Sequence, residues 1–158
     1  MKKPHRFAEG TAVPVEKTRG EIESLLIKHG ANGFLSAWQD RSAVIQFRLN
    51  GRMLRYAIEI PDPAEFKRNA THSWKVNSAE RCQVYADAEH RRRWRALLLI
   101  LKAKLEIVAS GDSSFDREFL ADIMLPQGGT VGEKLVPQIE HAYETGEMPR
   151  LLGPGGRD

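Results

Sequence analysis

The fold is decided by residues 79–110, whose sequence is AERCQVYADAEHRRRWRALLLILKAKLEIVAS. This stretch contains no proline or glycine and is followed by Gly111, which predicts a single long helix that ends there. One face of this helix collects the apolar side chains of Trp94, Leu97, Leu98, Leu101, Leu105 and Val108. A second apolar set on the far side comprises Ala96, Leu99, Ile100, Ala103 and Ile107. Because a helix that is apolar on most sides is usually buried on most sides, we expect its second half to be packed on both sides within a single core.

Two tight turns are predicted between Gly33 and Pro61, and they divide this segment into three strands. Asn50-Gly51 is a strong signal for a two-residue hairpin turn. It pairs Leu49 with Arg52, Phe47 with Leu54, Ile45 with Tyr56 and Ala43 with Ile58, which collects the apolar partners on one face. A second turn at Asp40-Arg41 places Phe34 opposite Phe47 and Trp38 opposite Ala43 on that inner face. The opposite face then carries Gln46, Arg48 and Arg55.

Three further helices are expected from capping signals. Thr18-Arg19-Gly20-Glu21 reads as a capping box, which predicts a helix over residues 19–29. Ser114 can cap a short helix over residues 115–124 that carries Phe115, Phe119 and Ile123. Thr130-Val131-Gly132-Glu133 repeats the capping box and predicts a last helix over residues 131–145, with Leu135, Ile139 and Tyr143 on its apolar face and a bend at Pro137.

These elements predict an α+β fold with the order α-β-β-β-α. A three-stranded antiparallel meander should pack on the long central helix, with a C-terminal helical pair after it. Helices should cover one face of the sheet while the other face stays in contact with water. We expect residues 1–14 to be a flexible arm, residues 15–152 a single domain and residues 153–158 a flexible tail.

Composition places the chain among intracellular globular proteins. It has 158 residues, 41% apolar and 28% charged, and a single cysteine, Cys82. One cysteine excludes a disulfide framework and a cysteine-based zinc site, which favours a reducing cytoplasm. The longest apolar run, residues 96–101, is far shorter than a membrane span, and the N-terminus lacks the pattern of a secretory signal.

Charge is distributed unevenly along the chain. Residues 1–111 carry a net charge of +8 and residues 112–158 a net charge of −5, which together give the overall +3. Guanidinium groups bind phosphates with two parallel hydrogen bonds, so the run His90-Arg91-Arg92-Arg93-Trp94-Arg95 indicates a phosphate-binding surface. The predicted nucleic-acid-binding residues are Arg91, Arg92 and Arg95 on the helix and Arg48, Arg52 and Arg55 on or near the sheet. Alternatively, the helix arginines pair with Asp87, Glu89 or the acidic C-terminal helices.

Other chemical motifs are weak. Asp62, Glu65 and Lys67 superficially match a metal-dependent nuclease motif, but they lie together in a proline-broken loop instead of on neighbouring strands. The five histidines have no metal-ligand spacing, and no glycine-rich loop cradles a phosphate. The C-terminal helical pair has the outline of a helix-turn-helix, but its acidic second helix would be repelled by DNA. We therefore expect no metal, no cofactor and no catalytic residues.

Two resemblances accompany these patterns. The order of elements is similar to that of double-stranded-RNA-binding domains, but the loop and lysine signatures of that family are absent, so its function is not transferred. Residues 15–152 resemble small uncharacterised proteins of tailed phages and prophages. The resemblance lies in VPVEKTRGEIESLLIKHGA (13–31), RRRWRALLLILKAKLE (91–106) and TVGEKLVPQIEHAYETGEMPRLL (130–152). It implies an intracellular accessory role during infection, with no residue assignments.

Three functions remain as alternatives at this point. The first is a non-enzymatic phage or prophage accessory protein that binds the nucleic-acid backbone. The second is a protein-binding inhibitor or modulator of a host or anti-phage defence factor, with the acidic C-terminal helices as its contact surface. A metal-dependent nuclease is third. No interaction with a membrane is expected, and the sequence leaves the oligomeric state open.

Overall fold

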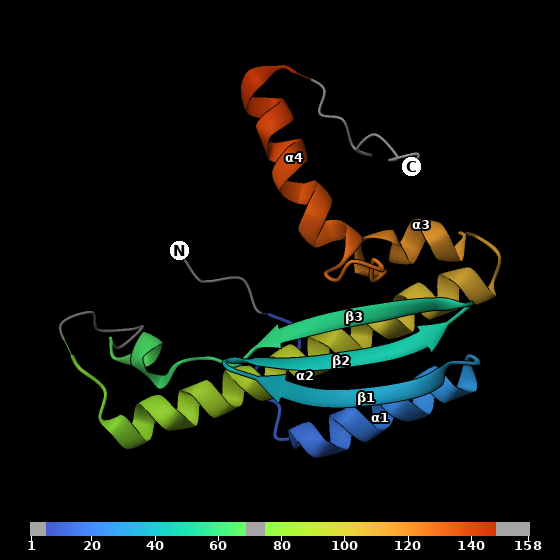
Figure 1. Ribbon diagram of the computed structural model, residues 1–158. Helices are drawn as coiled ribbons and strands as arrows, with labels where there is room; N and C mark the ends of the chain where they lie inside the picture. The colour runs from blue at the N-terminus through green and yellow to red at the C-terminus, as the bar shows by residue number, and fades with distance from the viewer. Residues whose placement is uncertain (1–5, 69–74, 148–158) are drawn as a thin grey trace.

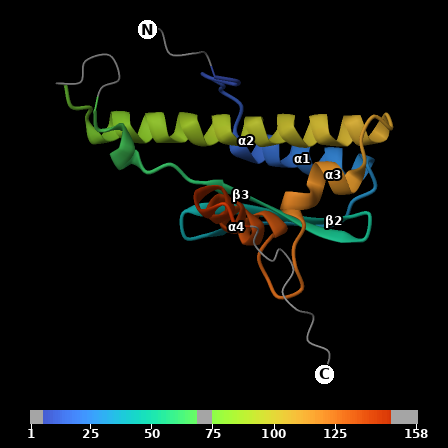
Figure 2. The ribbon, with the colours of Figure 1, turned by 90° about the horizontal axis from the view of Figure 1, so that it is seen from above.

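The computed structural model describes residues 6–68 and 75–147 of the chain. Helix α1 (Val15–Lys28) is followed by strands β1 (Asn32–Gln39), β2 (Ser42–Leu49) and β3 (Arg52–Glu59). After the 3₁₀ turn η1 (Pro63–Phe66) come the long helix α2 (Ala79–Ala109), the short helix α3 (Phe115–Phe119), the 3₁₀ turn η2 (Leu120–Asp122) and helix α4 (Val131–Thr145). Helices α1 and α2 form one layer and the sheet forms the other (Figures 1 and 2), which confirms the predicted α+β fold.

The sheet has the predicted order and register. The strands are antiparallel in the order β1-β2-β3, and Phe47 lies opposite Leu54 in β3 and opposite Phe34 in β1. Asp40 and Asn50 adopt positive φ values of 52° and 49°, as their two-residue turns require. Trp38 lies opposite Ala43 on the inner face, as predicted, but its side chain is 83% exposed and is not part of the core. It belongs to the edge strand, and no helix of the described chain covers it.

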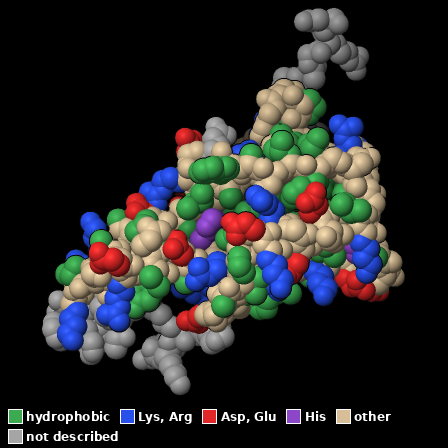
Figure 3. All heavy atoms as spheres, turned by 90° about the horizontal axis from the view of Figure 1, so that it is seen from below, with side chains coloured by type: hydrophobic (Ala, Val, Ile, Leu, Met, Phe, Trp, Pro, Cys, Tyr) green, Lys and Arg blue, Asp and Glu red, His purple; other side chains and the backbone are tan. Residues whose placement is uncertain are grey.

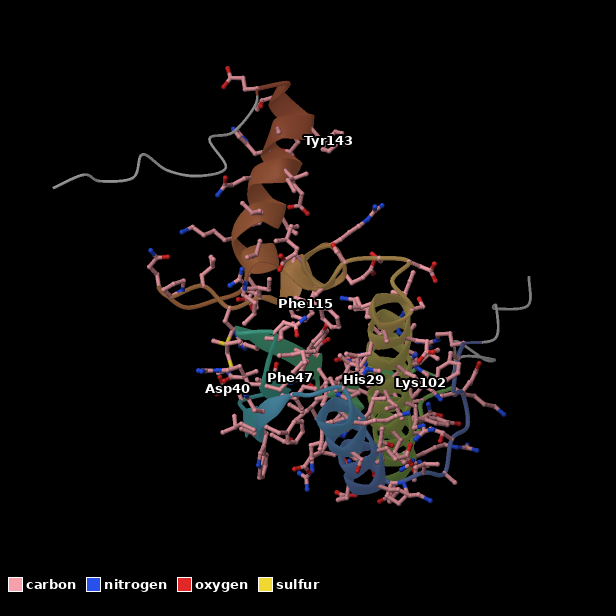
Figure 4. The ribbon with its side chains drawn as sticks, turned by 90° about the vertical axis from the view of Figure 1, so that its right-hand side faces the viewer. His29, Asp40, Phe47, Lys102, Phe115 and Tyr143 are labelled. Carbon is pink, nitrogen blue, oxygen red and sulfur yellow. The ribbon has the colours of Figure 1, made fainter. Side chains whose placement is uncertain are left out.

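Helix α2 is buried along one face only. Leu101 is completely buried, and Trp94, Leu97 and Leu105 join it in a core with Ile22, Leu26, Phe47 and Leu54. The expectation that the second half of α2 is packed on both sides is wrong, because Leu99 and Ile100 are 44% and 47% exposed. The sheet and α1 cover only part of the surface of α2 (Figure 4), so Leu99 and Ile100 stay partly in contact with solvent, although Phe7 of the N-terminal segment lines a groove with Leu99.

Helix α1 begins four residues before the predicted capping box. Pro14 is its N-cap, with extended backbone angles, and the helix starts at Val15. Thr18 lies inside the first turn, where it is completely buried and its hydroxyl donates to the carbonyl oxygen of Pro14 at 3.3 Å. A threonine hydroxyl can bond back to the carbonyl four residues earlier, so the Thr-x-x-Glu pattern does not mark this N-terminus.

The C-terminal segment is attached to β3. Its first helix is shorter than predicted, because α3 and η2 end at Asp122 and Ile123 forms an antiparallel bridge with Leu54. The capping box at the start of α4 is confirmed: Thr130 and Glu133 each accept from the backbone amide of the other. A Cβ added at Gly132 would lie 3.0 Å from the carbonyl oxygen of Ala121, so glycine permits the close approach of α4 to η2.

Helix α4 projects from the body of the protein (Figure 1). It continues through Pro137, ends at Gly146 in a left-handed conformation and has no fully buried residue. The segment expected to be a flexible arm is described from residue 6, and its Arg6 side chain pairs with Glu89 of α2. The expected tail, residues 153–158, lies outside the described residues.

Leu101→Ala should lower the free energy of unfolding by about 2–5 kcal/mol, since a completely buried leucine leaves a cavity when it is truncated. The matched control is Ile100→Ala on the exposed side of the same helix turn, which should cost less than about 1 kcal/mol. Urea unfolding of the two variants measures the difference. Equal losses would contradict the single buried face of α2.

Candidate interaction surfaces

The arginines at the middle of α2 contact acidic side chains of the same chain. Arg92 donates from Nε and Nη2 to the carboxylate of Glu89 at 2.8 and 2.7 Å. Arg93 contacts Glu89 and reaches Glu59 on β3, and Arg95 bonds Glu21 on α1. The alternative in which the helix arginines pair with Glu89 therefore describes Arg92 and Arg93. Arg93 also contacts Glu59, and Arg95 pairs with Glu21, so these two use partners distant in sequence.

Within the described chain, Arg91 bonds to the N-terminal segment and not to an acidic side chain. Its Nε donates to the carbonyl oxygen of Thr11 at 3.2 Å, and Phe7 of the same segment lines a groove between α1 and α2. Together with the Arg6–Glu89 pair, this contact holds residues 6–11 against α2. Arg91 and Arg95 thus connect α2 to its neighbours, whereas Arg92 pairs within the helix. Reversing the charges of Arg91 and Arg95 would disturb packing contacts as well as any phosphate site.

Electrostatics within this cluster are largely compensated. Hydrogen bonds from Arg92, with the charges of Arg92 and Arg6 beside it, hold the pKa of Glu89 below its usual range. The hydrogen bond with Glu89 in turn raises the pKa of Arg92. On the face of the molecule seen in Figure 3, basic and acidic side chains are intermingled and no continuous basic patch is visible. Although residues 1–111 carry a net charge of +8, their basic side chains do not form a continuous patch on that face.

The sheet arginines fall into two environments. Arg55 lies on the outer face of the sheet, opposite Gln46, and its Nη1 donates to Glu133 of α4 at 3.3 Å. Arg48 and Arg52 flank the Asn50-Gly51 turn and are exposed. Within residues 6–68 and 75–147 neither of them forms an ion pair.

The structure does not bring the six predicted residues to one surface. Arg48 and Arg55 lie on the outer face of the sheet, whereas α2 packs against the inner face (Figure 2). Arg91, Arg92 and Arg95 point away from the buried row of Leu97 and Leu101, so the sheet separates the two groups. Arg48 and Arg52 remain as the two members of the set with exposed, unpaired guanidinium groups in the described chain.

The residues of the nuclease-like motif stabilise a turn. The Asp62 carboxylate accepts from the backbone amide of Ala64 and from Arg41, and the amide lowers the pKa of Asp62. Glu65 accepts from the backbone amide of Asp62 and contacts Arg41. In the part of the chain that the structure describes, no three acidic, histidine or cysteine side chains are grouped to hold a metal ion.

The apolar face of α4 is a surface that the basic motif did not predict. Val136 and Ile139 are 49% and 44% exposed, and Tyr143, near the free end, is 89% exposed and points into open space (Figure 4). At 100° per residue, these side chains and Leu135 share one side of α4. Glu133, Glu140 and Glu144 form an acidic row beside them. The sequence indicates this face through the apolar set Leu135, Ile139 and Tyr143, and the second of the three predicted functions uses the acidic C-terminal helices as its contact surface.

Comparison of the chain with protein-family models, with curated proteins and with solved structures gives no match. The resemblance to phage and prophage proteins therefore stays a prediction. Among the helices described, none combines the length and the apolar character needed to cross a membrane.

His90 supplies a pH-dependent contact inside the arginine cluster. Its Nε2 accepts a hydrogen bond from the indole Nε1–H of the buried Trp94 at 3.0 Å, which requires that ring nitrogen to be unprotonated. Burial lowers the pKa of His90, and the charge of Arg93 lowers it further, against the opposing effects of Asp87 and Glu16. The native protein therefore favours neutral His90.

The stability of the protein should fall as pH is lowered through about 6.5, where an unfolded histidine takes up a proton that native His90 resists. The free energy of unfolding, measured in urea between about pH 7.5 and 5.5, should decrease less in His90→Gln, since glutamine does not titrate. His141→Gln, on the exposed side of α4, is the control and should keep the wild-type slope. Parallel slopes for His90→Gln and wild type would contradict the assignment.

Proposed function

We propose that the protein is a non-enzymatic protein-binding module that docks through the apolar face of α4. The observation that carries this proposal is the exposure of Val136, Ile139 and Tyr143 on a helix that projects from the body. A helix of 15 residues is only marginally stable in water by itself, because most helical stability comes from packing of the apolar face. An exposed apolar face on such a helix is typical of a segment that binds in a groove.

The charges beside this face describe the partner. Glu133 is paired with Arg55, which leaves Glu140 and Glu144 as the exposed acidic members of the row. The complementary surface is an apolar groove with lysine or arginine along one border. Tyr143 is suited to be the central anchor, since aromatic residues dominate binding energy at protein interfaces.

The predicted biological setting is consistent with this proposal. A phage accessory protein that modulates a host or defence factor needs a docking surface and no catalytic centre. The partner is then a bacterial protein, and the one cysteine described, Cys82, is buried and reduced, as suits the cytoplasm. The proposal follows the second of the three functions predicted from the sequence.

Two measurements test docking through α4: hydrogen exchange of the free chain, and binding of a partner protein to variants of the chain. In the free chain, the amides of α4 beyond its first turn should exchange much faster than those of α2, because no residue of α4 is buried. A protein captured from bacterial extract should bind, after purification, to wild type and not to Tyr143→Glu. Val84→Glu, an equally charged change on the exposed side of α2, is the control and should bind normally. Strong protection of α4 in the free chain, or equal affinity of all three proteins, would contradict docking through α4.

Nucleic-acid binding is the second candidate, and exposed, unpaired Arg48 and Arg52 favour it. Both lie beside the same hairpin turn, Arg48 on the outer face opposite Met53 and Arg52 on the inner face opposite Leu49, so a nucleic-acid backbone that contacts both crosses the end of the hairpin. Short single- and double-stranded DNA and RNA should then bind at low salt, with affinity that falls steeply as salt is added. Arg48→Glu with Arg52→Glu should abolish this binding, and Arg41→Glu at the opposite turn should not. The protein-docking proposal expects no salt-sensitive binding of these oligonucleotides to the wild type.

A further inference from the structure

Strand β1 presents a free sheet edge without the usual protection. It forms one end of the sheet order, and no other element of the described chain pairs with its outer side. Its eight residues, NGFLSAWQ, include no charged residue and no proline. Natural edge strands normally carry lysine, proline or a covering element, because unpaired backbone groups otherwise pair with another chain. Leu35 and Trp38 add apolar exposure of 53% and 83% on the two faces of the same strand.

The hydrogen-bonding pattern identifies which residues offer the free groups. Gln39 and Ser42 flank the two-residue turn at Asp40-Arg41, so they form a hydrogen-bonded pair. Pairs alternate along an antiparallel ladder, which makes Ala37 and Leu35 bond to β2 as well. Phe34, Ser36 and Trp38 therefore direct their backbone N–H and C=O groups outward.

The outward-facing residues of β1 can pair with the same three residues of a second copy. If a second β1 pairs in antiparallel orientation about a two-fold axis at Ser36, Phe34 lies opposite the second Trp38 and Trp38 opposite the second Phe34. Each of the three pairs exchanges two backbone hydrogen bonds. The two aromatic pairs fall on the inner face, where aromatic cross-strand pairs stabilise a sheet, and they cover the exposed Trp38. On the outer face, Leu35 meets Ala37 of the other copy.

Helix α1 carries a matching charge pattern beneath β1. Ile22 and Leu26 face the core, and Glu21 turns toward α2, where it bonds Arg95. The opposite side of α1 points beyond the free edge of the sheet at β1 (Figure 1). It carries exposed Arg19 and Glu23, which are one turn apart. The same two-fold axis sets the two α1 helices antiparallel. Arg19 of each copy can then face Glu23 of the other.

We propose that β1 pairs with β1 of a second copy about a two-fold axis at Ser36, forming one continuous six-stranded sheet across a homodimer. The partner is a second copy and not an unrelated strand, because the two-fold axis pairs Phe34 with Trp38 and Leu35 with Ala37 and brings Arg19 to Glu23. This interface uses β1 and α1 and leaves α4 free, so it stands independently of the proposed function.

The mass of the full chain in solution, measured by light scattering over a concentration series, should approach twice 17.8 kDa. Trp38→Lys should remain monomeric and keep the wild-type far-UV circular dichroism spectrum, since Trp38 is exposed in the single chain and lysine blocks edge pairing. Tyr143→Lys is the matched control and should dimerise like the wild type. A monomeric wild type at every concentration, or a dimer lost in Tyr143→Lys and kept in Trp38→Lys, would overturn the proposal.

A cross-link tests the register directly. In a hydrogen-bonded antiparallel pair the Cα atoms are about 5.5 Å apart, within the range that a disulfide spans. Ser36→Cys should therefore form a covalent dimer on mild oxidation, with Cys82 buried and unreactive. Ser24→Cys, on the exposed side of α1, should not form one at the same rate. Equal cross-linking of the two variants would refute an axis at Ser36.

Discussion

The burial of one side of α2 against the sheet and α1 is the constraint on which the whole structure depends. Leu97, Leu101 and Leu105 follow each other along that side and meet Phe47 and Leu54 from the sheet and Ile22 from α1. The protein has no metal centre or disulfide in its described residues to add stability, so this single core carries the fold. The arginine pairs act at its border: Arg95 connects α2 to α1, and Arg93 connects α2 to β3.

A second polar network fixes the C-terminal segment to this core. Asp122 accepts from the hydroxyl of Tyr56 at 2.6 Å and from Lys104 at 2.7 Å, so η2, β3 and α2 meet at one carboxylate. Burial, reinforced by Asp122, raises the pKa of Tyr56, and the hydroxyl therefore stays protonated as a donor. Lys104 also lies over the ring of Phe119, 5.2 Å from its centroid. None of these contacts reaches α4, whose first turn is joined to the sheet by the Arg55–Glu133 pair.

Local patterns predicted most of the fold, and long-range pairing limited the prediction of the site. The hairpin turns fixed the register because Asn50-Gly51 and Asp40-Arg41 leave few alternatives, and Ser78 and Gly111 bracket α2 closely. The basic run at residues 90–95 does not reveal the partners of its arginines. Glu21 and Glu59 lie 74 and 34 residues from their arginine partners, so no local pattern indicates that these charges are paired. For the same reason, periodicity identified the apolar faces of α2 and α4 but not which of them finds a partner within the chain.

The close approach at Gly132 has a consequence for how this protein can diversify. The direction of α4 depends on a short contact with the carbonyl of Ala121 and on the capping box of Thr130 and Glu133, all outside the core. Substitutions there can re-aim the helix while Leu101 and its neighbours remain packed. Related chains could thus share one rigid body and differ in the angle at which they present α4.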